Sequence, residues 1–254
     1  MKEDIFNEIL ETFENEDIKE FMVKKCMPTI CEYFKTVPAS SSGKYHPQIS
    51  LGEGGLMRHT IAVARFLNHM FGVESVANQF TSRERDLLRI AALMHDTRKS
   101  GSQEDFEKSK WTKFDHPLLA AEVIRGLGGL PSNEIELIAH VIESHMGAFN
   151  TDKRHPNIIL PKPTDKYQII VHLADYLASR KDIEMKFDNL TTEEVVQDPK
   201  SFVLPFGKHK GQTLGEIYES DKGYLNWLVN NIDQGQTTEA IKKLFEEKKT
   251  EKEV

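Results

Sequence analysis

The sequence predicts a mainly α-helical protein with a small α/β module at its C-terminal end. Apolar residues recur at steps of three and four over most of the first 180 positions, as expected for helices that bury one face. No segment before residue 200 alternates apolar and polar residues as a half-buried strand does. Beyond it, FVLPFGKHKGQT has the glycine and proline punctuation of a short hairpin. We therefore expect an N-terminal helical collar (1–36), a helical core (37–190) and a small C-terminal module (201–247).

The expected helices follow one another along the chain. Two short amphipathic helices are predicted between Asp4 and Phe34, followed by the irregular connection TVPASSSGKYHPQISLGEGG. Ser82 is predicted to cap one of the helices of the core. In the C-terminal module, LGEIY and YLNWLVNNI are predicted to be helical. The five helices expected in the core are Leu56–Phe71, Ser82–His95, Pro117–Leu127, Asn133–Ser144 and Lys166–Arg180.

The composition, with 39% hydrophobic and 29% charged residues, is typical of a globular protein. No apolar run approaches the roughly 20 residues that span a bilayer, and the acidic first segment differs from a secretory signal, so we expect a cytoplasmic protein without a membrane partner. The net charge of -7 argues against broad electrostatic binding to duplex nucleic acid. Cys26 and Cys31 are spaced for neither a disulfide framework nor a CxxC site, whereas the ten histidines suit a divalent metal.

Two adjacent metal-binding side chains, His95 and Asp96, end a helix whose preceding residues, LLRIAALM, are almost all apolar. Neighbouring helical positions point about 100° apart, so both side chains can reach one cation between them. His59 and Asp175 lie on the apolar stripes of two other helices, where an unpaired imidazole or carboxylate is costly. Each could instead be a satisfied polar group of the core, but three helices with inward ligands favour a metal site. His172, one turn before Asp175, is expected to pack beneath the site.

The order H, HD and D on successive helices, across roughly residues 50–185, resembles the HD phosphohydrolase superfamily. The sequence also resembles a branch of it with extra histidines, the 3′-to-5′ exoribonucleases, which show GGL, HT, HD, then H and SHHG before D. The resemblance implies an HD-type helical bundle with one or two divalent transition metal ions per chain, Mn, Fe, Ni or Co, with Mg as a further candidate. The metal ligands that it implies are His59, His95, Asp96, Asp175, His116, His145 and His140.

The extra histidines bear on the number of metal ions. In two-metal relatives similar histidines hold the second ion and the HD aspartate, here Asp96, bridges both. Met146 stands where the SHHG pattern has its second histidine, which removes one ligand. His140 and His145 are five residues apart, so on an unbroken helix their side chains diverge by about 140°. Both can face one site only if the helix ends between them; otherwise His140 is a core histidine.

The resemblance assigns catalytic roles to Asp96, Lys99 and Arg180. Lys99 occupies the lysine position of the HDxxK pattern, which approaches the substrate phosphate, while Arg98 replaces a more common glycine. Arg180, in DYLASR, matches an arginine that binds phosphate in many relatives; the alternative is a solvated cation at a helix end. His46 is expected to line the mouth of the site.

The function that the resemblance implies is that of a metal-dependent phosphohydrolase. It would cleave a phosphoester or phosphoanhydride of a nucleotide or oligonucleotide by metal-activated water. One alternative is a 3′-to-5′ exonuclease that acts on RNA or DNA ends. Another is a regulatory HD module that binds a nucleotide without hydrolysing it, although the complete set of ligand positions and Lys99 argue against this. The third alternative is a structural helical protein, in which the histidines have no joint role.

The C-terminal segment, roughly residues 202–232, resembles a small module of unassigned role found in some bacterial and phage proteins, at times beside exonuclease domains. Lys208, His209 and Lys210 lie between two glycines, so a tight turn would present cations and backbone amides to phosphate. Tyr224 and Trp227 would offer faces for base stacking, which predicts contact with nucleic acid. The alternative is that both rings belong to the module's own core, because they recur at helical spacing.

Overall fold

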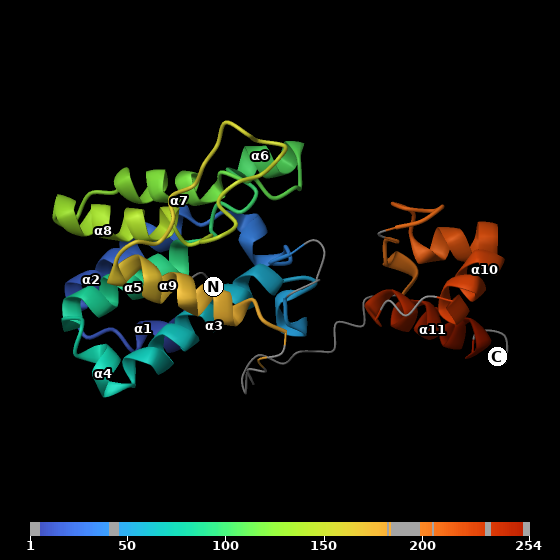
Figure 1. Ribbon diagram of the computed structural model, residues 1–254, viewed down its shortest axis with the longest axis horizontal. Helices are drawn as coiled ribbons and strands as arrows, with labels where there is room; N and C mark the ends of the chain where they lie inside the picture. Colours follow the sequence, from blue (N-terminus) through green and yellow to red (C-terminus); the bar gives the residue numbers. More distant parts are fainter. Residues whose placement is uncertain are drawn as a thin grey trace. The chain divides into compact units, whose positions relative to one another are not determined.

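The structure of the chain is a computed structural model (Figure 1). It describes residues 6–40, 46–181, 183, 199–204, 206–231 and 235–250. The chain divides into two compact units, residues 1–186 and 187–254. The predicted end of the core, residue 190, lies outside the described residues. Within the described part of the chain, no helix combines the length and the apolar character needed to cross a membrane.

The larger unit is a bundle of helices, which confirms the mainly α-helical fold class (Figure 1). Its packing brings α3 against α5 and α9, α8 against α5, α7 and α9, and α5 against α9. Each of the five long helices begins and ends within two residues of its predicted bounds. They are α3 (Gly55–Phe71), α5 (Ser82–Met94), α7 (His116–Arg125), α8 (Ser132–Glu143) and α9 (Lys166–Ala178).

Short helical elements occupy the connections of the larger unit. The two collar helices correspond to α1 and α2, whereas α4 and α6 are too short for their apolar pattern to predict them. One isolated antiparallel bridge joins Thr151 and Ile159. The short elements are α1 (Asn7–Leu10), α2 (Glu16–Phe21), the π-helical η1 (Met22–Cys26), the 3-10 helices η2 (Met27–Thr29), η3 (Glu32–Lys35) and η4 (Gln48–Ser50), α4 (Glu74–Ala77) and α6 (Gln103–Lys108).

The start of α5 is fixed by Thr81, so the prediction that Ser82 caps this helix is wrong. The Thr81 hydroxyl accepts a hydrogen bond from Glu84 N at 3.1 Å, and the Glu84 carboxylate accepts one from Thr81 N at 2.7 Å. This reciprocal pair is a capping box, which satisfies two backbone donors that the first turn leaves free. Ser82 becomes the first helical residue, and α5 runs from there to the His95-Asp96 pair.

The collar is tied to α5 by the fully buried Asp86. One carboxylate oxygen accepts hydrogen bonds from Glu14 N at 2.9 Å and Asn15 N at 2.7 Å, directly before α2. The other accepts one from Arg89 Nη1 at 2.6 Å. A buried carboxylate is stable only with such partners, so Asp86 holds the collar against the helix that leads to the HD pair.

The smaller unit contains η5 (Pro199–Ser201), α10 (Leu214–Asn231) and α11 (Gly235–Thr250). The predicted hairpin is present as one antiparallel bridge between Val203 and Thr213. In the described part of this unit, the β structure consists of this bridge. Asp221 interrupts α10 with φ −149° and ψ 60°, so this helix falls into two stretches, as the sequence predicts. The buried core of the unit consists of Leu204, Leu214, Ile217, Leu225, Leu228, Ile241 and Leu244.

Candidate metal centre

Five helices bring six polar side chains together inside the larger unit. All six are predicted metal ligands, and five of them are at most 1% exposed while Asp175 is half-buried. They are His59 on α3, His95 and Asp96 at the end of α5, His116 at the start of α7, His145 just after α8, and Asp175 on α9. Because α5 and α8 each end one or two residues before their ligands, the chain can turn these side chains inward.

One half of this cluster lies around Asp175. The Nε2 atom of His59 is 3.0 Å from Asp175 Oδ1 and 3.9 Å from Asp96 Oδ2. The Nε2 atom of His95 is 3.8 Å from Asp175 Oδ1 and 3.5 Å from Asp96 Oδ2. One ligand atom each from His59, His95 and Asp175 lies within 4.8 Å of the others, so the three residues could hold one metal ion.

The other half lies around the second carboxylate oxygen of Asp96. This Oδ1 atom is 3.0 Å from His116 Nε2 and 3.6 Å from His145 Nε2. His95, Asp96 and His145 form a second group whose ligand atoms lie within 4.8 Å of one another. Asp96 therefore joins the two halves and presents one oxygen to each.

Backbone carbonyl groups fix the orientation of three of these imidazoles. The Nδ1 atoms of His95, His116 and His145 each lie 2.7 Å from a carbonyl oxygen, those of Ala92, Lys113 and Ile142 respectively. A carbonyl oxygen only accepts, so each Nδ1 carries the proton and each Nε2 keeps a lone pair. These lone pairs point toward the carboxylate oxygens of the cluster, which are acceptors as well. A set of buried acceptors facing one another requires a cation or extra protons.

Four atoms of the cluster residues have no hydrogen-bond partner within the described part of the chain. They are Asp96 Oδ1, His59 Nδ1 and the Nε2 atoms of His95 and His116. A buried polar atom without a partner costs about 1–3 kcal/mol, so four in one cluster are expensive. Imidazole nitrogens and carboxylate oxygens are the donor atoms that divalent transition metals take up. The six residues therefore fit a metal centre.

The charges of the cluster are also those of a metal-binding site. Burial lowers the pKa of His95 to about 4 and also lowers the pKa of His116. Burial alone would raise the pKa of Asp96, but the positive charge of Lys99 and the neighbouring histidines hold it well below its usual value. Burial alone would also raise the pKa of Asp175, but the hydrogen bond from His59 and the charges of the neighbouring histidines together lower it. Near neutral pH the two buried imidazoles are neutral and the carboxylates are ionised, as metal binding requires.

Comparison with known proteins assigns this part of the chain to a family. The family described as HD domain matches residues 56–180, a range that contains all six residues of the cluster. This part of the chain is an HD domain. HD domains are in general metal-dependent phosphohydrolases, and the predicted resemblance to the HD superfamily is confirmed.

The smaller unit matches a second family. Residues 204–233 match the family described as Exodeoxyribonuclease X-like C-terminal, which agrees with the module expected over residues 202–232. Neither the curated proteins nor the solved structures contain a significant match to this chain.

Lys99 contacts the six-residue cluster of the HD domain. Its Nζ atom donates a hydrogen bond to Asp96 Oδ2 at 2.8 Å, the oxygen that also faces His59 and His95. The side chain is 15% exposed, so it is accessible from outside the cluster. This position supports the predicted approach of Lys99 to a substrate phosphate, which stays a prediction.

Arg180 lies two residues beyond the end of α9. Its guanidinium carbon is 3.9 Å from the centre of the Tyr176 ring, and its Nε atom is buried without a hydrogen-bond partner in the described part of the chain. No hydrogen bond or ion pair among the described residues joins Arg180 to the cluster. Its predicted contact with phosphate stays a prediction.

His140 does not belong to the cluster, which corrects the predicted ligand set. Its side chain is 61% exposed, and its two ring nitrogens lie 3.7 Å from Glu136 Oε2 and 3.2 Å from Glu143 Oε2. The end of α8 turns His145 inward, but His140 lies within the helix on its exposed face. His140 is also not the core histidine that the alternative described. The ligand set proposed for the HD domain therefore no longer includes it.

Two further histidines lie beside the cluster. The ring centres of His46 and His59 are 5.5 Å apart, and burial lowers the pKa of His46 to about 4. His172 packs against the chain under His145, whose carbonyl oxygen is 2.7 Å from His172 Nδ1. Gly147 has φ +56°, and a Cβ atom there would lie 2.1 Å from His172 Cε1, so the ring requires a glycine. These positions agree with the expectations that His46 lines the site and His172 packs beneath it.

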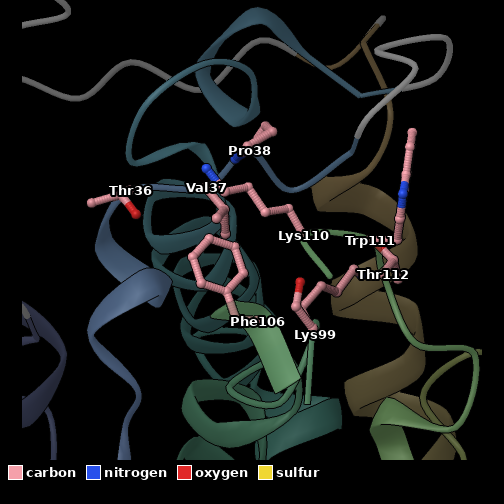
Figure 2. Close-up of a pocket in the computed structure, with 9 residues that line it drawn as sticks. Thr36, Val37, Pro38, Lys99, Phe106, Lys110, Trp111 and Thr112 are labelled. Atoms are coloured by element: carbon pink, nitrogen blue, oxygen red, sulfur yellow. The ribbon is translucent and has the colours of Figure 1, made fainter. Parts of the chain in front are cut away.

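A cavity of about 300 Å³ lies beside the cluster, and Lys99 lines it (Figure 2). The sequence pattern does not predict this cavity, because its walls come from segments that are far apart in the chain. Figure 2 shows Phe106 and Lys110 facing the same space as Lys99. The lining residues are Thr36, Val37, Pro38, Lys99, Ser100, Phe106, Lys110, Trp111 and Thr112.

The predicted cationic turn of the smaller unit lies between Gly207 and Gly211, which have φ values of +78° and +90°. Lys208 Nζ and His209 Nε2 lie 2.9 Å and 3.0 Å from Asp221 Oδ2. These contacts, that of His209 first, lower the pKa of Asp221 to about 2. Asp221 therefore offsets part of the positive charge of the turn.

Lys210 and Trp227 expose much of their side chains near this turn, as does Lys208, which pairs with Asp221. Lys210 has an exposed side chain, and Trp227 is 51% exposed. The Tyr224 ring stacks on Trp227 with centroids 6.1 Å apart, and its hydroxyl accepts a hydrogen bond from Lys208 N at 3.1 Å. Tyr224 is partly buried against the core of the unit, whereas Trp227 presents much of its ring to solvent.

Proposed function

We propose that the HD domain of this chain hydrolyses a phosphoester or phosphoanhydride bond of a nucleotide or oligonucleotide. The observation that carries this proposal is the convergence of buried imidazole lone pairs and carboxylates on one place, with Lys99 between that place and a cavity. A bound divalent cation would supply an acidified water molecule and neutralise charge on phosphoryl oxygens. Transition metals and, as a further candidate, Mg²⁺ suit these ligands.

The ligand geometry supports a centre that takes one or two ions. His59, His95 and Asp175 would hold one of them. His116, His145 and the second carboxylate oxygen of Asp96 would hold a second ion.

Lys99 would act on the substrate. Its ammonium group donates a hydrogen bond to Asp96 and also lines the cavity. From there it would bind a phosphoryl oxygen of a substrate in the cavity and stabilise the charge that develops there. Arg180 would provide a second, planar donor for phosphate. The bulk of the domain excludes water from the five most deeply buried ligands.

A hydrolysis screen tests the proposal. The full chain would be incubated with nucleoside triphosphates, nucleoside monophosphates, cyclic nucleotides and short oligonucleotides, each with Mn²⁺, Mg²⁺, Fe²⁺ or Ni²⁺. We expect turnover of at least one class, and its loss in Asp96→Asn. Metal-dependent binding of a nucleotide without turnover of any substrate would contradict hydrolysis and favour the regulatory alternative.

A 3′-to-5′ exonuclease is the second candidate function, and the smaller unit favours it. The match of residues 204–233 to the C-terminal family of exodeoxyribonuclease X supports an association with nucleic acid. The exposed Lys210 and the half-exposed Trp227 would supply a phosphate contact and a stacking surface. Release of mononucleotides from the 3′ end of a labelled oligonucleotide would distinguish this activity from hydrolysis of free nucleotides.

A further inference from the structure

The Phe106 ring forms a fixed aromatic wall of the cavity beside Lys99. It is stacked on the ring of Tyr33, with the two centroids 4.6 Å apart and the planes at 27°. Tyr33 is 2% exposed, and its hydroxyl donates a hydrogen bond to Gly101 O at 2.8 Å and accepts one from Ser100 N at 3.2 Å. Because Tyr33 covers one face of Phe106 and is itself anchored, the other face is held in position toward the cavity (Figure 2).

The groups around this face have the chemistry of a nucleotide site. Lys110 Nζ lies 5.9 Å from the centre of the Phe106 ring, at the outer limit of a cation–π contact. Trp111 is 75% exposed, so its ring is available as a second stacking surface. Lys99 connects the cavity to Asp96 and the metal centre. Hydroxyl groups that can bind base edges or a sugar come from Thr36, Ser100 and Thr112.

We infer that this cavity binds one unpaired nucleobase of the substrate, stacked on Phe106, while the adjoining phosphate lies at Lys99. The inference rests on the proposed function and adds where the base is held. A cavity of about 300 Å³ is at the lower end of ligand sites, which suits one nucleoside and excludes a base pair. The base would replace Lys110 over the ring, and the freed ammonium group would contact a phosphate. Stacking tolerates every base, so the site selects an unpaired nucleotide more than a particular base.

Tryptophan fluorescence can test this binding without relying on turnover. The chain has two tryptophans, so Trp227→Phe leaves Trp111, at the cavity, as the single reporter. The probes are AMP, UMP and a three-nucleotide oligonucleotide, with ribose 5-phosphate as the matched ligand that lacks a base. They are titrated into the full chain in the presence of a chelator, so that hydrolysis does not interfere. We expect saturable quenching by probes that contain a base and none by ribose 5-phosphate.

Phe106→Leu is the decisive variant, because leucine keeps an apolar side chain but removes the aromatic face. We expect it to raise the Kd of the nucleotide by roughly tenfold, as loss of one base–aromatic stack does. Phe149→Leu, at an exposed phenylalanine outside the cavity, is the control and should leave the Kd unchanged. Thermal unfolding and metal content of both variants would show that fold and centre are intact.

The outcomes separate this inference from the proposed function. Quenching by mononucleotides alone would identify free nucleotides as the source of the base, and stronger binding of the oligonucleotide would identify a strand end. Equal binding of ribose 5-phosphate, or an unchanged Kd in a folded Phe106→Leu variant, would overturn the inference even if the chain hydrolyses nucleotides. Base-dependent quenching without turnover under any metal would leave the inference standing and overturn the proposed hydrolysis.

Discussion

His116 Nε2 lies 3.0 Å from Asp96 Oδ1, and both atoms are buried without a hydrogen-bond partner in the described part of the chain. The His116 Nδ1 atom holds its proton against Lys113 O, so the two facing atoms are both acceptors. Two buried acceptors at this distance repel each other unless a cation or a proton lies between them.

Replacing Asp96 by alanine should remove the metal centre. This carboxylate faces both halves of the cluster, so its loss removes a ligand oxygen from each half. We expect metal content, measured by elemental analysis, to fall to background and turnover to fall by more than about 100-fold. Asp17→Ala, at a surface carboxylate that pairs with Arg83, should retain both. Full metal content in Asp96→Ala would refute the site.

The number of bound ions should depend on His116 and His145. These two imidazoles face the second oxygen of Asp96, so the double variant His116→Ala/His145→Ala should lose one of two ions and retain about half of the metal. His140→Ala is the matched control, because His140 is exposed and pairs with glutamates outside the cluster. A wild-type chain that never holds more than one ion under metal-replete conditions would contradict a two-ion centre.

Lys99→Met should lower turnover while metal content stays near that of the wild type. The lysine contacts Asp96 from the side of the cavity and is not a metal ligand, and its removal takes away a positive charge that stabilises the transition state. We expect kcat to fall by roughly 10- to 1000-fold, measured with the substrate found in the hydrolysis screen. Loss of metal in this variant would show that Lys99 supports the centre instead.

The metal-free protein should lose stability as the pH falls below about 6.5. Burial lowers the pKa of His95 to about 4 in the folded chain, whereas an unfolded chain has a value near 6.5. Between these values the unfolded state binds more protons, so the stability present above pH 6.5 is lost as the pH falls toward 4. The buried His116 shifts in the same direction.

Each such histidine contributes a slope of up to about 1.4 kcal/mol per pH unit within that range. Urea unfolding of the chelator-treated chain between pH 7 and pH 4.5 measures it. The carboxylates of Asp96 and Asp175 have lowered pKa values and titrate below this range, so they do not obscure the effect. A free energy of unfolding that stays constant from pH 7 to pH 5 would contradict the prediction.

Removing residues 200–254 should weaken cleavage of oligonucleotides and spare that of mononucleotides. Among the described residues, no hydrogen bond or ion pair involves the exposed side chain of Lys210, whereas Lys208 is paired with Asp221. Either lysine-to-glutamate variant turns attraction to phosphate into repulsion. Lys210→Glu should reproduce more of the loss than Lys208→Glu, because Asp221 already offsets the charge of Lys208. The KM values for a labelled oligonucleotide and for a mononucleotide would be compared. Equal effects on both substrate classes would assign the module a role outside nucleic-acid binding.

The sequence by itself determined the positions of the long helices and most of the proposed ligands. Apolar residues recur at regular helical spacing over α3, α5 and α9, because each helix buries a broad apolar stripe. A polar residue within such a stripe is therefore easy to recognise in the sequence. His59, His95, Asp96 and Asp175 could therefore be chosen before any distance was known. His145 followed from the resemblance, and its inward position depends on the end of α8 at Glu143.

Only the tertiary structure decided which side chains meet. The sequence places His140 and His145 among the candidate ligands, but the turn after α8 buries His145 and leaves His140 on the exposed face of the helix. Thr81 and Ser82 both carry a hydroxyl group that can cap a helix. Only the backbone geometry of the structure shows that Thr81 caps α5. The cavity beside Lys99 combines residues 36–38 with residues 99–112, and no periodic pattern links two such segments. Short-range periodicity reports which face of a helix is buried, whereas a site depends on contacts between segments distant in the chain.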